Sequence, residues 1–339
     1  MKNILITGGC GYLGSHCAVK LIEKGYKVII VDNLSNSDSS IIDKITKITK
    51  SKVIFYKGDI RDNKLVDKIF FQNKVDSIFH FSGLKSISES IKYPIKYYSS
   101  NVEGTINLLR AMESHNVNKI IFSSSATVYG NNYKLPWHEE LCPLLPNNPY
   151  ADTKLTIEKI LQALSKSKIL FKIGILRYFN PAGCHSSGLI GDNLENKNNL
   201  FPSILRVIMK RDKYLNIYGN NYDTKDGSGI RDYIHVNDLI EGHLKAFNYI
   251  NNHDGYHLWN LGMGKGLSVY EIINVFEEKI GKKINTKIKP KREGDIAQFW
   301  SSTIKAKREL LWEPEKNIKD MVEDSVYYLQ KSYNYKIFN

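Results

Sequence analysis

A tyrosine and a lysine stand four residues apart in the stretch PYADTK, as Tyr150 and Lys154. The run TIEKILQAL that follows has helical periodicity and no breaker, so the two side chains should lie one turn apart on the same helix face. A neighbouring ammonium favours the ionised form of a phenol, whose ordinary pKa is about 10, and so makes it a better general base. In isolation, an amphipathic tyrosine and a solvated helix lysine explain the pair better. The rest of the sequence must decide between the two interpretations.

A glycine-rich stretch near the N-terminus has the features of a dinucleotide site. In TGGCGYLG, Gly8, Gly11 and Gly14 follow a strand-like run and precede a helical one. Glycines there permit a tight turn and close approach of the backbone to a pyrophosphate, and the helix N-terminus offers free N–H groups. Asp32 ends the next strand, where this fold places an acid on the ribose hydroxyls. Because a carboxylate would repel a 2′-phosphate, we expect NAD rather than NADP.

Both acids near this site have a plainer explanation. Taken alone, Asp32 is equally well explained as a turn-former in VDNLSNS. Asp59 follows another strand and could accept a hydrogen bond from the adenine amino group, or it could be a strand-end turn residue. The dinucleotide prediction therefore rests on the glycine stretch in its strand–helix context.

The elements that must position these residues alternate along the first half of the chain. The strand-like runs KNILIT, KVIIVD, VIFYKGD, SIFHFSG, KIIFSSS and KIGILRYFN are separated by helical patterns that begin near Tyr12, Asn63, Asn101 and Tyr150. This alternation predicts an α/β fold with a doubly wound parallel sheet, a Rossmann-type NAD-binding domain.

The second half has a looser pattern. Beyond Asn180 come a long polar stretch, two helical runs and an S-x-x-E capping box at Ser268 and Glu271 that starts an apolar helix face. We expect the NAD-binding domain to cover residues 1–180, with segments near 230–265 returning to it. A smaller α/β C-terminal substrate domain should cover residues 181–339.

Bulk composition narrows the class of protein. The 339 residues are 42% hydrophobic with a formal charge of +13, which fits a globular chain. The charge would favour anionic partners, but the lysines are spread along the chain without an arginine-rich tract, so we expect no nucleic-acid partner. The four cysteines lack metal-ligand spacing, and we expect reduced thiols and no metal site. A strand that begins at residue 2 and the lack of a long apolar run predict a cytoplasmic protein without a signal peptide or membrane partner.

Taken together, TGGCGYLG, SSSATVYG and PYADTK resemble the extended short-chain dehydrogenase/reductase superfamily. The stretches DNLSNS, HFSGLKS, LRYFNPAG, DGSGIRDYIHVNDL, NLGMGKG and REGD resemble those of its UDP-glucose 4-epimerases. The resemblance implies bound NAD and epimerisation at C4 of a UDP-hexose, which interconverts UDP-galactose and UDP-glucose through a 4-keto intermediate. It also implies a homodimer formed by helices around residues 101–115 and 150–166.

The resemblance assigns roles around the reacting carbon. Tyr150 is the base on the sugar 4-hydroxyl, Lys154 holds the nicotinamide ribose, and Ser125 hydrogen-bonds the reacting oxygen, although a serine at a strand end also has a plain structural explanation. The expected cofactor contacts are Gly8, Gly11, Tyr12, Leu13, Gly14, Asp32, Asn33, Asp59, Ile60, Phe81, Gly83, Lys85, Asn101, Ser123, Ser124, Tyr150, Lys154 and Tyr178.

Two arginines stand out in a lysine-rich chain. The planar fork of arginine suits diphosphate oxygens, and the resemblance places Arg231 and Arg292 on the UDP diphosphate. Without it, Asn180 would be a loop Asx-turn and Asp295 an ion-pair partner of Arg292. The expected substrate contacts are Lys85, Ser125, Tyr150, Phe179, Asn180, Asn199, Leu200, Tyr218, Arg231, Arg292, Asp295 and Phe299.

Three positions discriminate between related activities. Ala126 and Thr127 stand where sugar-nucleotide 4,6-dehydratases carry an acidic pair, so dehydration is not expected. Phe299 stands where related enzymes often have Tyr, and its bulk predicts poor activity on UDP-GlcNAc and UDP-GalNAc. Two alternatives stay open: another UDP-sugar 4-epimerase, acting on a pentose, uronate or N-acetylhexosamine, and a non-catalytic NAD-sensing regulatory protein.

Overall fold

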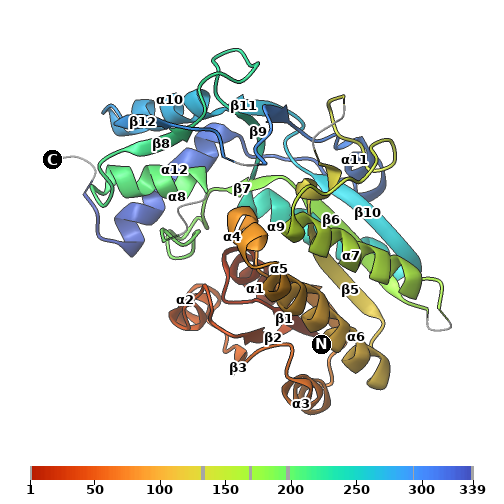
Figure 1. The fold of residues 1–339 in the computed structure, drawn as a ribbon. Helices are drawn as coiled ribbons and strands as arrows, with labels where there is room; N and C mark the ends of the chain where they lie inside the picture. Colours follow the sequence, from red (N-terminus) through yellow and green to blue (C-terminus); the bar gives the residue numbers. More distant parts are fainter. Residues whose placement is uncertain (1, 131–133, 168–169, 196–198, 293, 337–339) are drawn as a thin grey trace.

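The chain forms two lobes in a computed structural model that describes residues 2–130, 134–167, 170–195, 199–292 and 294–336 (Figure 1). The larger lobe is built on a seven-stranded sheet with the order β10-β6-β5-β4-β1-β2-β3, in which every neighbouring pair is parallel. Its strands are β1 (Asn3–Thr7), β2 (Lys27–Asp32), β3 (Ile54–Lys57), β4 (Ser77–His80), β5 (Lys119–Ser125), β6 (Lys172–Tyr178) and β10 (Gly255–Leu261). The predicted doubly wound parallel sheet is confirmed.

The middle positions of β1 and β2 are all apolar because helices cover both faces of the sheet. Successive side chains of a strand point to opposite faces. Ile4 and Ile6 of β1 accordingly enter one core cluster, and Leu5 between them enters another. The continuous runs in KNILIT and KVIIVD follow from this burial on both faces.

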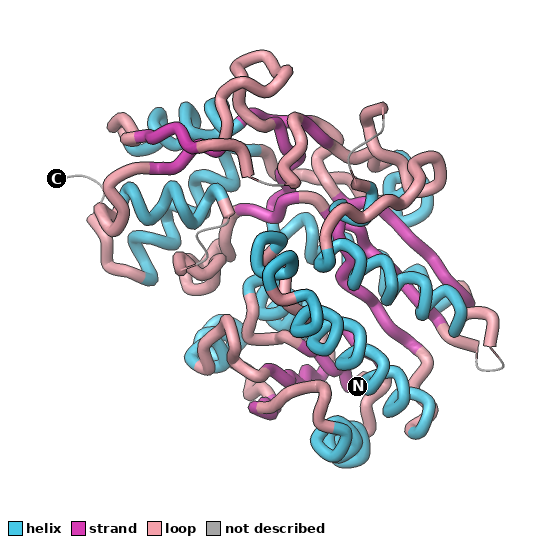
Figure 2. Tube along the Cα trace, viewed as in Figure 1, coloured by secondary structure: helices cyan, strands magenta, loops and turns pink. Residues whose placement is uncertain are grey.

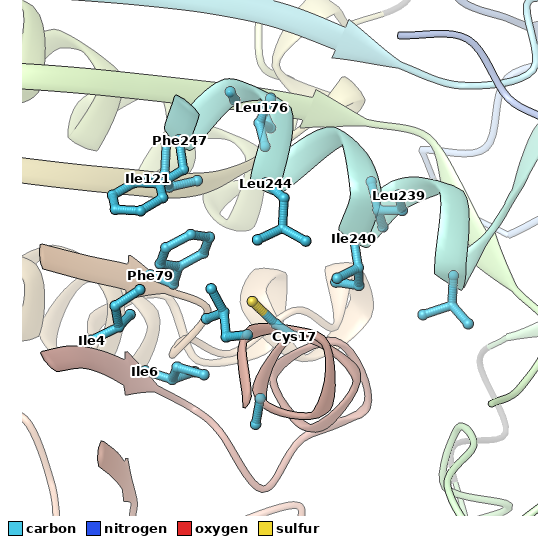
Figure 3. Close-up of a cluster of buried hydrophobic side chains, with 14 of the residues drawn as sticks. Ile4, Ile6, Cys17, Phe79, Ile121, Leu176, Leu239, Ile240, Leu244 and Phe247 are labelled. Atoms are coloured by element: carbon cyan, nitrogen blue, oxygen red, sulfur yellow. The ribbon is translucent and has the colours of Figure 1, made fainter. Parts of the chain in front are cut away.

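Helices from both halves of the chain cover the first face. Figure 3 shows Cys17 of α1 facing Leu244 and Phe247 of α9, with Ile4 and Phe79 from the sheet beside them. The helices of this face are α1 (Tyr12–Glu23), α2 (Ser40–Thr49), α9 (Val236–Asn252) and α11 (Ile304–Leu310). The opposite face is covered by α3 (Asn63–Asn73), α6 (Gly104–Ser114) and α7 (Pro149–Leu164).

One helix begins earlier than the sequence pattern indicates. Asn101, expected near a helix start, lies inside a continuous helical run made of α5 (Pro94–Tyr97), the π-helical turn η1 (Tyr98–Glu103) and α6. The short α4 (Ile87–Lys92) precedes this run, and the 3-10 turn η2 (Ala126–Tyr129) follows β5. The π turn places Asn101 in the interior, at 2% exposure.

The strand order changes direction at β1, which pairs with β2 on one side and with β4 on the other. Open α/β sheets bind ligands beyond the carboxyl ends of the strands at such a switch point. Here the glycine turn and the loop after β4 meet closely: Gly8 has φ +70°, and a Cβ on it would lie 2.8 Å from the Ser82 nitrogen. A Cβ on Gly14 would overlap the Gly8 carbonyl oxygen. Only glycine fits either position.

The smaller lobe surrounds a separate apolar core. One sheet joins β7 (Asn180–Ala182), β9 (Ile230–His235), β11 (Gly266–Ser268) and β13 (Gln298–Phe299), and β8 (Leu215–Tyr218) pairs with β12 (Thr286–Lys289). The helices are α8 (Leu200–Ile208), α10 (Val269–Ile280) and α12 (Ile318–Ser332). The predicted capping box at Ser268 and Glu271 is present at the start of α10, and the apolar stripe that follows it is core, with Ile272 and Phe276 fully buried.

The segment near 230–265 divides between the lobes. β9 belongs to the smaller sheet, whereas α9 and β10 return to the larger one. Figure 2 shows the strands of the two lobes as separate groups. The domain division at residue 180 stays a proposal. Within the described segments, no helix has the length and hydrophobicity needed to cross a bilayer.

Candidate active site

The first two turns of α7 carry the tyrosine and the lysine. The helix starts where the Asn148 side chain accepts a hydrogen bond from the Ala151 N–H at 2.9 Å, with Pro149 in the first helical position. Both features are strong helix-start signals. Tyr150 and Lys154 therefore lie one turn apart on the same helix, as the periodicity predicts.

Lys154 is buried and anchored to the end of β5. Its Nζ donates to the Ser123 carbonyl at 2.8 Å and lies 4.8 Å from the centroid of the Phe122 ring. Burial lowers the pKa of Lys154 to about 8, and the nearby Glu158 carboxylate opposes that shift. The ammonium is thus held at the carboxyl edge of the sheet.

Ser125 is arranged to donate a hydrogen bond. Its Oγ accepts from the Thr127 N–H at 3.3 Å and from the Thr127 hydroxyl at 3.0 Å, which leaves its own O–H for Tyr150. Burial raises the pKa of Tyr150, and the hydrogen bond with Ser125 lowers it. The Lys154 ammonium is turned to the Ser123 carbonyl.

Ser124 points away from its two neighbours. Its hydroxyl donates to Glu158, whose carboxylate also pairs with Arg177 at 2.5 Å, both ionic side chains being 2% exposed. Successive residues of a strand face opposite sides. Ser124 is expected to contact the cofactor, but its hydroxyl is engaged in this buried network. Only the main-chain atoms of Ser124 can therefore contact a cofactor.

Asn101 holds the loop after β4 against α7. Its Oδ1 accepts from the Leu84 N–H at 2.8 Å, and its Nδ2 donates to the Leu84 carbonyl at 3.0 Å and to the Thr153 hydroxyl at 3.1 Å. Thr153 in turn donates to the Tyr150 carbonyl at 2.7 Å. One side chain thus fixes the loop of Gly83 and the exposed Lys85 relative to the candidate base.

A buried histidine continues this chain of hydrogen bonds to the glycine turn. The Thr105 hydroxyl donates to the Asn101 carbonyl at 2.6 Å, so it accepts from His80 Nε2 at 2.8 Å. His80 Nδ1 must then accept from the Thr7 hydroxyl at 2.6 Å. Burial lowers the pKa of His80 to about 3, so the ring is neutral. Sequence reasoning missed His80, Thr105 and Thr153, and the only available signal was a histidine inside an apolar strand.

The glycine turn and the end of β2 form a cradle for a dinucleotide. Asp32 is 7% exposed, and its carboxylate accepts from the Cys10 N–H at 3.0 Å and from the Ser37 hydroxyl at 3.0 Å. The residue before α1 is Gly11, which has no side-chain cap, so the first-turn N–H groups are available to a phosphate. The uncapped helix start and the carboxylate of Asp32 have the chemistry that the pyrophosphate and a ribose of NAD need.

The remaining cofactor candidates lie around this cradle. Asn33 Nδ2 donates to Asp59 at 2.9 Å, and the Arg61 side chain lowers the pKa of Asp59 well below its usual range. The Arg61 N–H also donates to Asp59, as expected if Asp59 is a turn residue at a strand end. The Tyr12 hydroxyl donates to the Gly183 carbonyl at 2.6 Å. Leu13, Phe81 and Tyr178 are partly buried against the core, and Ile60 is buried within it.

A cavity of ≈ 440 Å³ opens between the lobes. Its lining includes nine of the predicted residues: Tyr12, Asn180, Asn199, Leu200, Tyr218, Arg231, Arg292, Asp295 and Phe299. The predicted Lys85, Ser125, Tyr150 and Phe179 are outside this lining, but it includes Ala126 and Thr127, which directly follow Ser125. The cavity therefore runs from the smaller lobe to the neighbourhood of the candidate base. Lining residues that sequence reasoning missed include Trp137, Asn148, Asn216 and Tyr233.

The arginines of the cavity are held by aromatic rings and acids. The guanidinium carbon of Arg292 lies 3.7 Å from the Tyr218 ring centroid. Arg231 lies on β9 with Nη2 3.8 Å from Asp295 Oδ1, so the ion pair shown for Asp295 is with Arg231. Burial lowers the pKa of Arg231, and Asp295 opposes that shift. Asn199 Nδ2 donates to Asp192 at 2.8 Å.

Comparison with known proteins gives matches over nearly the whole chain. The family model described as GDP-mannose 4,6 dehydratase matches residues 5–325. The UDP-glucose 4-epimerase of Bacillus subtilis is 44% identical over 323 residues, 95% of each chain. That of Yersinia enterocolitica is 47% identical over 324 residues, which cover 95% of this chain and 96% of the relative.

Solved structures match the fold as closely. The UDP-glucose 4-epimerase of Bifidobacterium longum in complex with NAD+ and UDP superimposes with a TM-score of 0.94, at 43% identity and with 98% and 99% of the two chains covered. The Stenotrophomonas maltophila UDP-glucose 4-epimerase with bound NAD and formylated UDP-arabinopyranose also gives 0.94, at 39% identity over 99% of this chain and 100% of that one.

Proposed function

This chain belongs to the UDP-glucose 4-epimerase family of extended short-chain dehydrogenase/reductases, and we propose that it interconverts UDP-galactose and UDP-glucose with NAD as its cofactor. The observation that carries the proposal is the placement of Tyr150, Lys154 and Ser125 at the carboxyl edge of the sheet. Beside them lie the glycine turn of a dinucleotide site and a cavity between the lobes that contains two arginines. A base, a cofactor cradle and a nucleotide-sugar pocket thus meet at one place.

The residues that would hold NAD lie in the larger lobe. The free N–H groups at the start of α1 would bind its pyrophosphate, and Asp32 would accept hydrogen bonds from the adenosine ribose. Lys154, anchored to the end of β5, would hold the nicotinamide ribose. When bound, NAD would supply a reversible acceptor for the hydride of sugar C4.

Proton transfer falls to Tyr150. Its phenolate removes the proton of the sugar 4-hydroxyl, and the one O–H of Ser125, which bonds Tyr150 without substrate, turns to the reacting oxygen when the sugar is bound. Burial alone works against this step because it raises the Tyr150 pKa, so the hydrogen bond from Ser125 matters for poising the base. The 4-keto sugar then turns about its link to the diphosphate, which Arg231 and Arg292 hold, and presents its other face.

The loop after β5 argues against dehydration, although the matching family model bears the description of a dehydratase. Elimination of water needs a general acid and base near the sugar. Ala126 has no such group, and the Thr127 hydroxyl donates to Ser125. Return of the hydride to the same carbon fits these side chains better.

Phe299 sets the class of sugar that we propose. It lines the cavity with an apolar ring and packs in a cluster with Trp137 and Phe179. A rigid aromatic ring leaves less room for an acetamido group than for a hydroxyl. We therefore expect UDP-galactose and UDP-glucose to be turned over well, and UDP-GlcNAc and UDP-GalNAc poorly.

We further propose a homodimer through the helical face of α5 to α7. Apolar side chains are exposed there, with Ile95 at 84% and Tyr93 at 48% exposure. Burial of such side chains against a second copy would be favourable. Light scattering should give the mass of a dimer for the wild type and of a monomer for Ile95→Asp, and an unchanged mass in the variant would contradict this interface.

The deciding experiment follows UDP-galactose by proton NMR without added reductant. The wild type should form UDP-glucose, and Tyr150→Phe should not. Tyr335→Phe is the matched control, because that hydroxyl donates to the Ile208 carbonyl in the smaller lobe. No conversion even with NAD added would contradict the proposal. Bound NAD would then favour another UDP-sugar epimerase, and no bound NAD would favour a regulatory protein.

A further inference from the structure

The ring of Phe299 is packed on several sides. Trp137 stacks on it with 5.1 Å between centroids and 6° between planes. Phe179 lies 5.9 Å away at 41°, and the guanidinium carbon of Arg231 lies 4.8 Å from the Phe299 centroid. Both Phe299 and Trp137 line the cavity between the lobes. These neighbours therefore restrict rotation of the Phe299 side chain and fix the position of its ring.

Trp137 itself is fixed through its main chain. Its N–H donates to the Trp300 carbonyl at 2.9 Å, and its carbonyl accepts from the Ser302 N–H at 2.8 Å and from Asn260 Nδ2 at 3.0 Å. These bonds join the segment of Trp137 to the segment that follows Phe299. The indole is 3% exposed and also packs on Tyr129, at 5.2 Å between centroids. The indole cannot move aside without breaking this packing.

We propose that Trp137 is a specificity-determining residue, which blocks the space into which the Phe299 ring would have to move to admit an N-acetylated sugar. The inference rests on the proposed epimerase function and extends it. Close-packed interiors yield little, so a bulky C2 substituent can enter only if the ring that faces it has somewhere to go. The stacked indole removes that option. Selectivity is therefore a property of the pair and not of Phe299 alone.

The test compares substrates within each variant. Trp137→Leu keeps the main-chain hydrogen bonds and removes most of the indole volume. We expect the ratio of kcat/KM for UDP-GalNAc to that for UDP-galactose to rise about tenfold or more, the scale of small steric changes in apolar pockets. Trp137→Phe, a milder change that guards against loss of folding, should raise the ratio less. Phe299→Cys opens the pocket directly and should raise it most.

A buried tryptophan elsewhere provides the matched control. Trp312→Leu removes a ring that is 1% exposed in the core of the larger lobe, so it destabilises the fold without touching the pocket, and its ratio should equal that of the wild type. A gain in Phe299→Cys but in neither Trp137 variant overturns the inference and leaves the epimerase proposal standing. A wild type that already turns over UDP-GalNAc as fast as UDP-galactose overturns it too. Wild-type inactivity on UDP-galactose overturns the proposed function itself.

Discussion

The two sides of the candidate site are built differently. On the side of the larger lobe, Lys154, Asn101 and His80 are buried and joined by hydrogen bonds between strand ends. On the side of the smaller lobe, the half-buried Arg231 and Arg292 contact the rings of Phe299 and Tyr218, and Arg231 also donates to the Ile230 carbonyl at 2.9 Å. The first arrangement joins buried side chains to one another, whereas the second presents cationic side chains to the cavity.

This difference matches the two tasks that we propose. Proton and hydride transfer need reacting groups held within a fraction of an ångström, and buried hydrogen bonds supply that rigidity. A diphosphate that stays bound while its sugar turns over needs charge more than fixed geometry. The contrast therefore predicts chemical defects from changes in the larger lobe and binding defects from changes in the smaller lobe.

The largest effect should come from the base. Tyr150→Phe is expected to lower kcat by about 10²–10⁴-fold, the usual contribution of a general base, because no other described group is placed to take the 4-hydroxyl proton. Affinity for UDP, measured by titration calorimetry, should stay the same. A loss of UDP affinity as large as the loss of kcat would contradict the division between the two sides.

Acid should weaken the larger lobe next. Burial lowers the pKa of His16 and His80 to about 3 and that of His243 to about 4, and all three lie in the larger lobe. The unfolded chain, with histidine pKa values near 6.5, binds more protons in the interval below that value, so stability is present above pH 6.5 and is lost as pH falls. Each histidine contributes a slope of about 1.4 kcal/mol per pH unit.

Urea unfolding at pH 7, 6 and 5 measures this slope. The free energy of unfolding should fall over that interval, and Asp232, whose pKa burial raises to about 6, opposes only part of the fall because it is one group against three histidines. Constant stability between pH 7 and pH 5 would show that these histidines are not held neutral by burial.

A change in the hydrogen bonds that join His80, Thr105 and Asn101 should have an intermediate effect on stability and kcat. Thr105→Val keeps the shape but leaves His80 Nε2 without its acceptor, which should cost about 1–3 kcal/mol of stability. Because Thr105 also bonds Asn101, we expect kcat to fall and added NAD to be retained less well. Thr49→Val removes a hydroxyl that donates to the Ile45 carbonyl and accepts from the Ser51 N–H at the end of α2, and it serves as control. Equal behaviour of the two variants would argue against a positioning role for the chain.

The smallest effect on kcat should come from the cationic side chains of the smaller lobe. Arg231→Lys keeps the charge but loses the planar fork, and it should weaken UDP binding about tenfold, roughly 1.4 kcal/mol, with little change in kcat at saturating substrate. Arg211→Lys, at an exposed ion pair with Glu195, is the matched control. A collapse of kcat in Arg231→Lys would mean that the smaller lobe also sets the reacting geometry.

Much of the fold was predictable because its signals are local. The apolar runs of β1 and β2, the glycine turn and the helical spacing of Tyr150 and Lys154 each depend on neighbouring residues and on backbone sterics. The resemblance then supplied candidate residues for the substrate and the cofactor, and eight of the substrate candidates and one cofactor candidate line the cavity. Their roles in binding and catalysis stay predictions until they are measured.

The sequence by itself determined the order of strands and helices, the position of the cofactor turn and the pairing of tyrosine with lysine. Only the tertiary structure decided that Ser124 faces Glu158, that His80 links Thr7 to Thr105, and that Trp137 stacks on Phe299. Periodicity specifies which face of an element is buried, but not which side chain from a distant segment will meet it there. Those partners are chosen by the packing of the whole chain, and they are the contacts on which the proposed selectivity and positioning depend.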